Sequence, residues 1–214
     1  MNKKTPILFL LFSILTFSTL WGQTTVKHNL SVRAGYANML GGTAGLTNSS
    51  NSYERELCSG FSWDAQYNYL TSSKVGLGML YSGYTASGKL TYSSDHIYTH
   101  YLAPQFALIV YQKKQFKLQA NAGLGYIFYL NNSTVFGKDR KVTGGNLAAN
   151  IGVAAEYRIN NRWGVSLGTQ YVESSLKEIN TFYHGENIKV KLGDGGNQLN
   201  LSRLNISAGV NFYF

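Results

Sequence analysis

The sequence contains very little cysteine, proline or charge for its length. Among its 214 residues there are 1 Cys, 2 Pro and 14% charged residues, beside 23 Gly, 16 Tyr and 11 Phe. The single cysteine, Cys58, excludes an intramolecular disulfide and a zinc site built from several thiolates. Few prolines together with many glycine and aromatic residues favour strands, and a hydrophobic fraction of 44% is too high for a disordered chain.

A hydrophobic run long enough to cross a membrane as a helix is also missing from the sequence. The apolar stretch at residues 7–20 follows Lys3 and Lys4, and it is shorter than the roughly 20 residues that a transmembrane helix needs. This arrangement is typical of a secretory signal peptide. We therefore assign residues 1–22 to a signal peptide, and residues 23–214 to one mature domain with no cysteine at its start to carry a lipid.

The sequence does have a two-residue period of apolar and polar side chains. Every second residue from Phe116 to Leu130 is apolar, and the positions between them include Lys117, Gln119 and Asn121. This alternation is longer than a globular strand of about 5 or 6 residues, but it suits a tilted strand that crosses a membrane. The same pattern predicts eight strands, at residues 26–39, 61–70, 74–85, 100–111, 116–130, 147–159, 162–175 and 203–214.

The connections between these strands alternate in length. Outer-membrane barrels have short periplasmic turns and longer external loops. The sequence therefore predicts an all-β fold, an eight-stranded antiparallel up-and-down transmembrane β-barrel in a Gram-negative outer membrane, with both termini in the periplasm. The short turns are expected at residues 71–73, 112–115 and 160–161, and the long external loops at about 40–58, 86–97, 131–145 and 177–197.

Three local features refine this barrel. Residues 89–101 have the pattern of a hairpin around Ser93–Asp95, and residues 188–192 suggest a second strand pair. We expect both to be barrel strands that extend beyond the lipid, with a disordered loop as the alternative. Pro104 lies inside a predicted strand, where it removes a hydrogen-bond donor from the ladder. We therefore expect a bulge at Pro104.

The last strand carries the most specific feature of the sequence. Its apolar face consists of Ile206, Ala208, Val210, Phe212 and Phe214. Together with the signal peptide and the eight alternating strands, this face resembles the small outer-membrane β-barrel family that includes OmpX and the membrane domain of OmpA. The resemblance implies that the last strand is the signal read by the barrel assembly machinery.

The polar faces of the strands are expected to fill the lumen, because an eight-stranded barrel is just wide enough for its own side chains. Arg33 and Asp64, on adjacent strands, are the expected ion pair, and Asp64 and Glu156 are the only acids expected to face inward. We interpret this network as structural, with gating as the alternative. Its candidate residues are Arg33, Asp64, Gln66, Gln105, Lys117, Asn121, Glu156, Arg158 and Arg203.

Basic residues outnumber acidic ones by 19 to 10. They are scattered along the chain instead of forming one stripe, which argues against nucleic acid as a partner. Bases near the periplasmic end would meet the headgroups of outer-membrane lipids. They are Lys27, Lys74, Lys113, Lys114, Lys117, Arg158 and Arg162.

No motif for catalysis, for a metal or for a cofactor is present. The four histidines, His28, His96, His100 and His184, lack partners at catalytic or metal-binding spacings. We therefore predict no enzymatic activity and no cofactor, with a lipid-modifying barrel enzyme as the most remote alternative. The expected function is a structural or surface-interaction role for a monomeric barrel that contacts lipid and an external protein or surface ligand. The alternative is a narrow, porin-like channel for small solutes.

Overall fold

The computed structural model describes residues 27–41, 51–192 and 198–214. The expected signal peptide and its cleavage site lie outside these residues, so the domain boundary stays a prediction. The elements are β1 (His28–Met39), α2 (Asn51–Cys58), β2 (Ser59–Leu70), β3 (Val75–Leu90), β4 (Ser93–Lys113), β5 (Phe116–Val135), β6 (Lys138–Arg158), β7 (Trp163–Glu173), β8 (Ser175–Leu176), β9 (Glu178–Tyr183), β10 (Glu186–Lys191), β11 (Leu199–Asn200) and β12 (Arg203–Tyr213).

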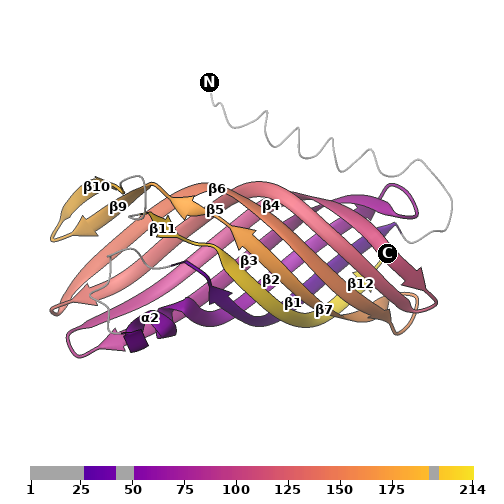
Figure 1. Ribbon diagram of the computed structural model, residues 1–214, viewed down its shortest axis with the longest axis horizontal. Helices are drawn as coiled ribbons and strands as arrows, with labels where there is room; N and C mark the ends of the chain where they lie inside the picture. The colour runs from indigo at the N-terminus through magenta and orange to yellow at the C-terminus, as the bar shows by residue number, and fades with distance from the viewer. Residues whose placement is uncertain (1–26, 42–50, 193–197) are drawn as a thin grey trace, which may run out of the picture.

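Eight long strands form a closed antiparallel ring, which confirms the predicted barrel (Figure 1). From β1 to β7 each strand pairs with the next one along the chain, and β12 pairs with both β7 and β1. The closing ladder runs from Asn29↔Tyr213 to Met39↔Arg203. Because a ring has no free edge, its backbone N–H and C=O groups can be paired without water.

Three short turns gather at one end of the barrel, which we call the turn end, and the C-terminus also lies there (Figure 1, right). The N–H of Thr71 donates to the Val75 carbonyl (2.9 Å), and Asn160 Oδ1 accepts bonds from the N–H groups of Arg162 and Trp163 (2.8 and 2.9 Å). The predicted turns at 71–73 and 160–161 are thus confirmed. The β4–β5 turn is shorter than predicted, because β4 continues to Lys113.

At the opposite end, which we call the loop end, strands β3 to β6 continue beyond the ring (Figure 1, left). The turns of these hairpins lie at Thr91–Tyr92 and Phe136–Gly137. The hairpin predicted within 89–101 is therefore present with a slightly earlier turn, whereas the loops predicted at about 86–97 and 131–145 are wrong because strand covers most of both. Backbone pairing continues here beyond the lipid, and the buried apolar side chains of these extensions face inward instead of outward.

A second hairpin extends the loop end. Strands β9 and β10 pair around a turn at His184–Gly185, where both residues have positive φ (55° and 83°). Strand β9 also pairs with β6, from Arg140↔Tyr183 to Thr143↔Asn180. The strand pair suggested by residues 188–192 is confirmed, although the loop expected at 177–197 is mostly strand in its described part.

The bulge expected at Pro104 is wrong. The β3–β4 register passes Met79↔Pro104 without interruption, and the β4–β5 register is the same on both sides of the proline. Ala103 and Pro104 have no ladder partner in β5, so the missing donor interrupts one ladder without adding a residue. The register shift of β4 lies nearer the turn end, between Ile109 and Tyr111.

The ring has the reverse polarity of a water-soluble protein. Leu124, Leu147 and Leu167 are 74, 75 and 68% exposed on the outer wall, while Glu156 and Arg203 inside are 2 and 0% exposed. The predicted inward and outward faces are therefore correct along these strands. An outer wall of exposed apolar side chains suits a barrel that is surrounded by lipid.

We predict that Ile151→Arg on this outer wall lowers the free energy of unfolding in lipid vesicles by about 2–4 kcal/mol, because a guanidinium would enter the hydrocarbon. Ile151 is 63% exposed and lies on β6, between the ends of the ring. Denaturant unfolding of the reconstituted protein measures the change.

Phe182→Arg provides the matched control, since Phe182 is 51% exposed on β9, beyond the ring. Its expected change is about 0–1 kcal/mol, as near a membrane interface. A small effect of both substitutions would show that water, and not lipid, surrounds Ile151.

Candidate functional site

Arg33 and Asp64 form the central ion pair of the lumen, as the sequence predicts. They lie opposite each other on β1 and β2, with the Arg33 guanidinium 2.7 Å from Asp64 Oδ1. Arg33 also donates to Gln66 Oε1 (3.0 Å), and Ser207 donates to the second Asp64 oxygen (3.3 Å). Both charged side chains are more than nine-tenths buried, so these bonds replace the water that each charge has lost.

A second ion pair lies nearer the turn end. Lys117 Nζ is 2.7 Å from Glu156 Oε2, which also accepts bonds from Tyr213 Oη (2.8 Å) and Asn29 Nδ2 (3.3 Å). Arg158, the next inward-facing residue of β6, lies 4.4 Å from the centroid of the Tyr213 ring. Glu156 is therefore fully engaged by its neighbours, whereas Arg158 lies against an aromatic ring.

Side-chain amides join β4 to β6 over Gly123 of the intervening strand β5. Gln105 on β4 and Asn150 on β6 exchange two hydrogen bonds of 2.8 and 3.1 Å, and Tyr101 donates a third bond to Asn150 (2.8 Å). Asn121 accepts a bond from Gln119 (2.7 Å). Gln105 and Asn121, both proposed for the lumen from the sequence, thus bond to other lumen amides, while Gln66 accepts from Arg33.

Arg203 crosses the lumen on the loop-end side of these amides. Its side chain is fully buried and reaches from β12 to Ser82 on β3 (3.1 Å to Oγ) and to Thr99 on β4. The guanidinium also lies 5.8 Å from the Tyr84 ring centroid. No carboxylate of the described residues forms an ion pair with Arg203, so hydroxyl groups and an aromatic face stabilise this cation.

The loop-end half of the lumen is apolar, which the sequence did not predict. Leu80, Tyr84 and Ile127 point inward at positions where alternation predicts polar residues, and each is at most 1% exposed. Helix α2, placed by the sequence in a loop, packs Tyr53 and Leu57 against this cluster. The i, i+4 spacing of these two residues was the available signal for a short amphipathic helix.

Asp95 is an inward acid that the sequence analysis missed. It is 3% exposed and accepts bonds from Tyr53 Oη and Asn131 Nδ2 (2.6 Å), with Arg140 at 3.5 Å. Burial, and then the neighbouring Asp95 carboxylate, raise the pKa of Tyr53 well above its ordinary value. The expectation of only two inward acids is therefore wrong, because the early turn at Thr91–Tyr92 moves Asp95 from a hairpin tip into a strand.

The polar and apolar layers together close the lumen. A void between Arg33, Asn121 and Gln170 measures about 10 Å³. A single water needs at least about 10–15 Å³, so this void is at the limit for one molecule. Among the described residues, the middle of the barrel is therefore closely packed.

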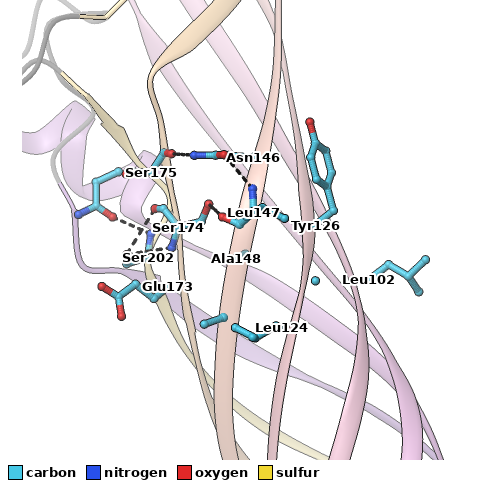
Figure 2. Close-up of a pocket in the computed structure, with 13 residues that line it drawn as sticks. Leu102, Leu124, Tyr126, Asn146, Leu147, Ala148, Glu173, Ser174, Ser175 and Ser202 are labelled. Atoms are coloured by element: carbon cyan, nitrogen blue, oxygen red, sulfur yellow. Dashed lines mark hydrogen bonds between the residues drawn. The ribbon is translucent and has the colours of Figure 1, made fainter.

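A pocket of about 750 Å³ interrupts the outer wall where β6 changes partner (Figure 2). Strand β6 pairs with β7 up to Ala149↔Glu173 and with β9 from Thr143↔Asn180, so residues 144–148 have no partner in either strand. Side chains replace the ladder there, because Asn146 Nδ2 donates to the Ser175 carbonyl (2.6 Å) and Ser174 Oγ to the Leu147 carbonyl (3.0 Å). The apolar floor of the pocket belongs to the outer wall and not to the lumen.

The described residues contain no helix that is long and apolar enough to cross a bilayer. They also contain no group of three or more His, Cys, Asp or Glu side chains arranged to hold a metal ion. His100, on the outer wall, bonds to Tyr81 Oη through Nδ1 (2.8 Å). The prediction that the protein has no catalytic activity stays a prediction.

We predict that Arg33→Ala lowers the free energy of unfolding of the micelle-folded protein by about 3–5 kcal/mol, because it leaves the buried Asp64 carboxylate without its cation. Thermal unfolding followed by circular dichroism measures the loss.

The double variant Arg33→Met with Asp64→Leu removes both charges and should recover a large part of that loss. An unchanged melting profile for Arg33→Ala would contradict a stabilising pair. Equal losses in the single and double variants would instead assign the effect to packing.

No protein-family model matches the sequence, and a search of curated proteins finds no relative. Solved structures do match. A major outer membrane protein from Thermus thermophilus has a TM-score of 0.58 at 13% identity, over 87% of this chain and 99% of that chain. Ail of Yersinia pestis, solved with the heparin analogue sucrose octasulfate, has a TM-score of 0.54 at 11% identity, over 87% and 99%.

The outer membrane protease OmpT from Escherichia coli also matches, with a TM-score of 0.52 at 10% identity over 92% of this chain and 99% of that chain. At such identities the likeness shows the fold alone, because proteins of very different activity share it. The expected resemblance is confirmed at that level: the chain has the fold of the small outer-membrane β-barrel proteins.

Proposed function

We propose that this protein is an integral outer-membrane barrel with a closed lumen and a structural or surface-interaction role. The observation that carries the proposal is the combination of an apolar outer wall with a filled interior, in which Arg203 and the Tyr53 and Leu57 side chains of α2 are buried towards the loop end. The outer wall needs lipid, whereas the filled interior leaves no route for solute.

In this proposal the turn end faces the periplasm and the loop end faces outward. The support is the asymmetry of the barrel, with turns of a few residues at one end and strands that continue beyond the ring at the other. Bacterial outer-membrane barrels have short periplasmic turns and longer external connections. The C-terminal residue, Phe214, is then periplasmic.

The loop end presents a sheet of six strands, in the order β10-β9-β6-β5-β4-β3. One edge strand is β3, whose Gly88 lies beside Tyr53 and Leu57 of α2. The other edge is β10, whose six residues are all exposed and which pairs only with β9 among the described residues. An open edge strand can bind an extended segment of an external protein by strand addition.

The proposed partners at the turn end are lipid and the barrel assembly machinery. The outward face of β12 carries the expected signal residues, with Phe212 opposite Leu30 and Val210 opposite Val32 in the closing ladder. This strand is exposed on its apolar face, since Ile206 and Phe214 are 62 and 55% exposed. An apolar C-terminal strand is therefore accessible to the machinery before the ring closes. The proposal treats the barrel as a monomer with no cofactor.

Cysteine labelling tests the proposed orientation of the barrel. In a Cys58→Ser background, Asn187→Cys on β10 should react with a membrane-impermeant maleimide on intact cells, whereas Asn161→Cys in the β6–β7 turn should react only after the outer membrane is permeabilised. Both positions are exposed, so accessibility depends on the side of the membrane. The reverse labelling order would invert the proposed orientation, and recovery of the protein in a soluble fraction would refute the membrane location.

Conductance measurements test whether the lumen is closed. The refolded protein in a planar bilayer should show no steady single-channel openings, because the Arg203 side chain reaches across the interior from β12 to β3 and β4. A porin measured in the same bilayer shows that openings would be detected. Steady openings whose conductance changes in Gln105→Ala or Asn121→Ala would contradict the closed lumen and establish the channel.

A further inference from the structure

The turn end contains a vestibule of about 530 Å³ at the mouth of the lumen. Its residues come from nearly every side of the ring, so it is a concave mouth and not a surface dent. The pocket is of ordinary size for a small ligand. It is lined by Lys27, Asn29, Leu70, Thr71, Ser72, Ser73, Ile109, Gln112, Lys117, Arg158 and Tyr213.

The charge of this vestibule is positive. Lys27, Lys117 and Arg158 line it, and Glu156 at its base is the acid beside them. Since Glu156 already pairs with Lys117 and accepts bonds from Tyr213 and Asn29, it does not neutralise Lys27 or Arg158. A cleft lined by charges of one sign between low-dielectric walls concentrates ions of the opposite sign.

The turn residues around the mouth include four more bases and no Asp or Glu. All four are exposed and none lines the vestibule, so water and salt screen their charge and they contribute little to binding inside it. These bases are Lys74, Lys113, Lys114 and Arg162.

The geometry also orients the donors. The Arg158 guanidinium lies 4.4 Å from the centroid of the Tyr213 ring, and Lys117 Nζ lies 5.7 Å from the same centroid. A guanidinium against an aromatic ring keeps in-plane N–H groups that can donate to a bidentate oxyanion. The Ser72 and Ser73 hydroxyl groups and the Gln112 amide also line the vestibule and can donate, whereas the Thr71 hydroxyl already donates to the Val75 carbonyl (3.0 Å).

We propose that this vestibule binds the phosphate group of an anionic ligand. A phosphate carries about one to two negative charges near neutral pH, which matches the two cations that Glu156 leaves unneutralised, and its oxygens suit an arginine fork with lysine at its side. Two sources present this group at the turn end: the headgroup of an anionic phospholipid and a soluble phosphate.

The position of the mouth makes the lipid source accessible. Tyr157, Trp163 and Phe214 lie outward at the turn end and are 50, 48 and 55% exposed. Aromatic side chains collect at the interface between lipid and water, so these residues place the mouth at headgroup depth. A headgroup that folds over the rim would reach Lys27 and Arg158.

The experiment titrates inorganic phosphate into the full-length mature protein in phosphatidylcholine nanodiscs, at constant ionic strength, and follows amide and arginine NMR shifts. Saturable shifts at the vestibule are expected. Arg158→Gln should weaken binding about tenfold, because it removes a charge-assisted hydrogen bond. Lys27→Gln, on a different strand end, should also weaken it, and it keeps the test valid if Arg158→Gln fails to fold.

Arg162→Gln is the matched control. It removes the same charge four residues away, on the exposed β6–β7 turn and outside the vestibule lining. It should change affinity less than about twofold, since exposed charges contribute little. Equal weakening by Arg158→Gln and Arg162→Gln, or shifts that never saturate, would overturn the proposal.

A second arm separates the two sources of phosphate. Nanodiscs that contain phosphatidylglycerol should raise the apparent Kd for inorganic phosphate if a lipid headgroup occupies the vestibule. An unchanged Kd would assign the vestibule to a soluble phosphate. Either result leaves the vestibule as a phosphate site, and neither depends on the surface role or the closed lumen.

Discussion

Closure of the backbone hydrogen-bond ring is the constraint on which the rest of the structure depends. In an apolar solvent an unpaired N–H or C=O group costs several kcal/mol, so β1 must find β12 although every other strand of the ring lies between them in the sequence. The ladder from Asn29↔Tyr213 to Met39↔Arg203 achieves this closure. Once the ring is closed, each strand has one face towards lipid and one towards a narrow interior, and the sequence alternates accordingly.

The closed ring then dictates the chemistry of the lumen. Side chains that avoid lipid meet in a space too narrow for bulk water, so the charges must find partners among themselves. Asp64 and Glu156 each have a base at 2.7 Å, and the amides of Gln105 and Asn150 satisfy each other. Arg203 is the exception, since hydroxyl groups and an aromatic ring hold it instead of a carboxylate.

The sequence predicts the ring well because alternate residues of a membrane strand face lipid, and alternate residues of these segments are apolar. Lipid selects every second residue, so strand identity, facing and the Arg33–Asp64 pair can be read from alternation alone. Beyond the lipid this selection ends, so alternation does not predict the extensions of β5 and β6 around Phe136–Gly137. Helix α2 and the inward Asp95 are not predicted for a related reason: both depend on tertiary packing at the loop end, where the apolar side chains face inward and lipid does not select the outward face.

The two mouths of the lumen differ because burial differs between them. At the loop end Asp95 is covered by α2 and receives its hydrogen bonds from Tyr53 and Asn131, so its counter-groups are built into the fold. At the turn end the vestibule is open, and Lys27 and Arg158 keep contact with water while the deeper Lys117 is paired with Glu156. A charge that retains water can exchange one anionic neighbour for another at little cost, whereas a buried charge cannot. Exchangeable recognition of an anion is therefore physically reasonable at the turn end and not in the middle of the barrel.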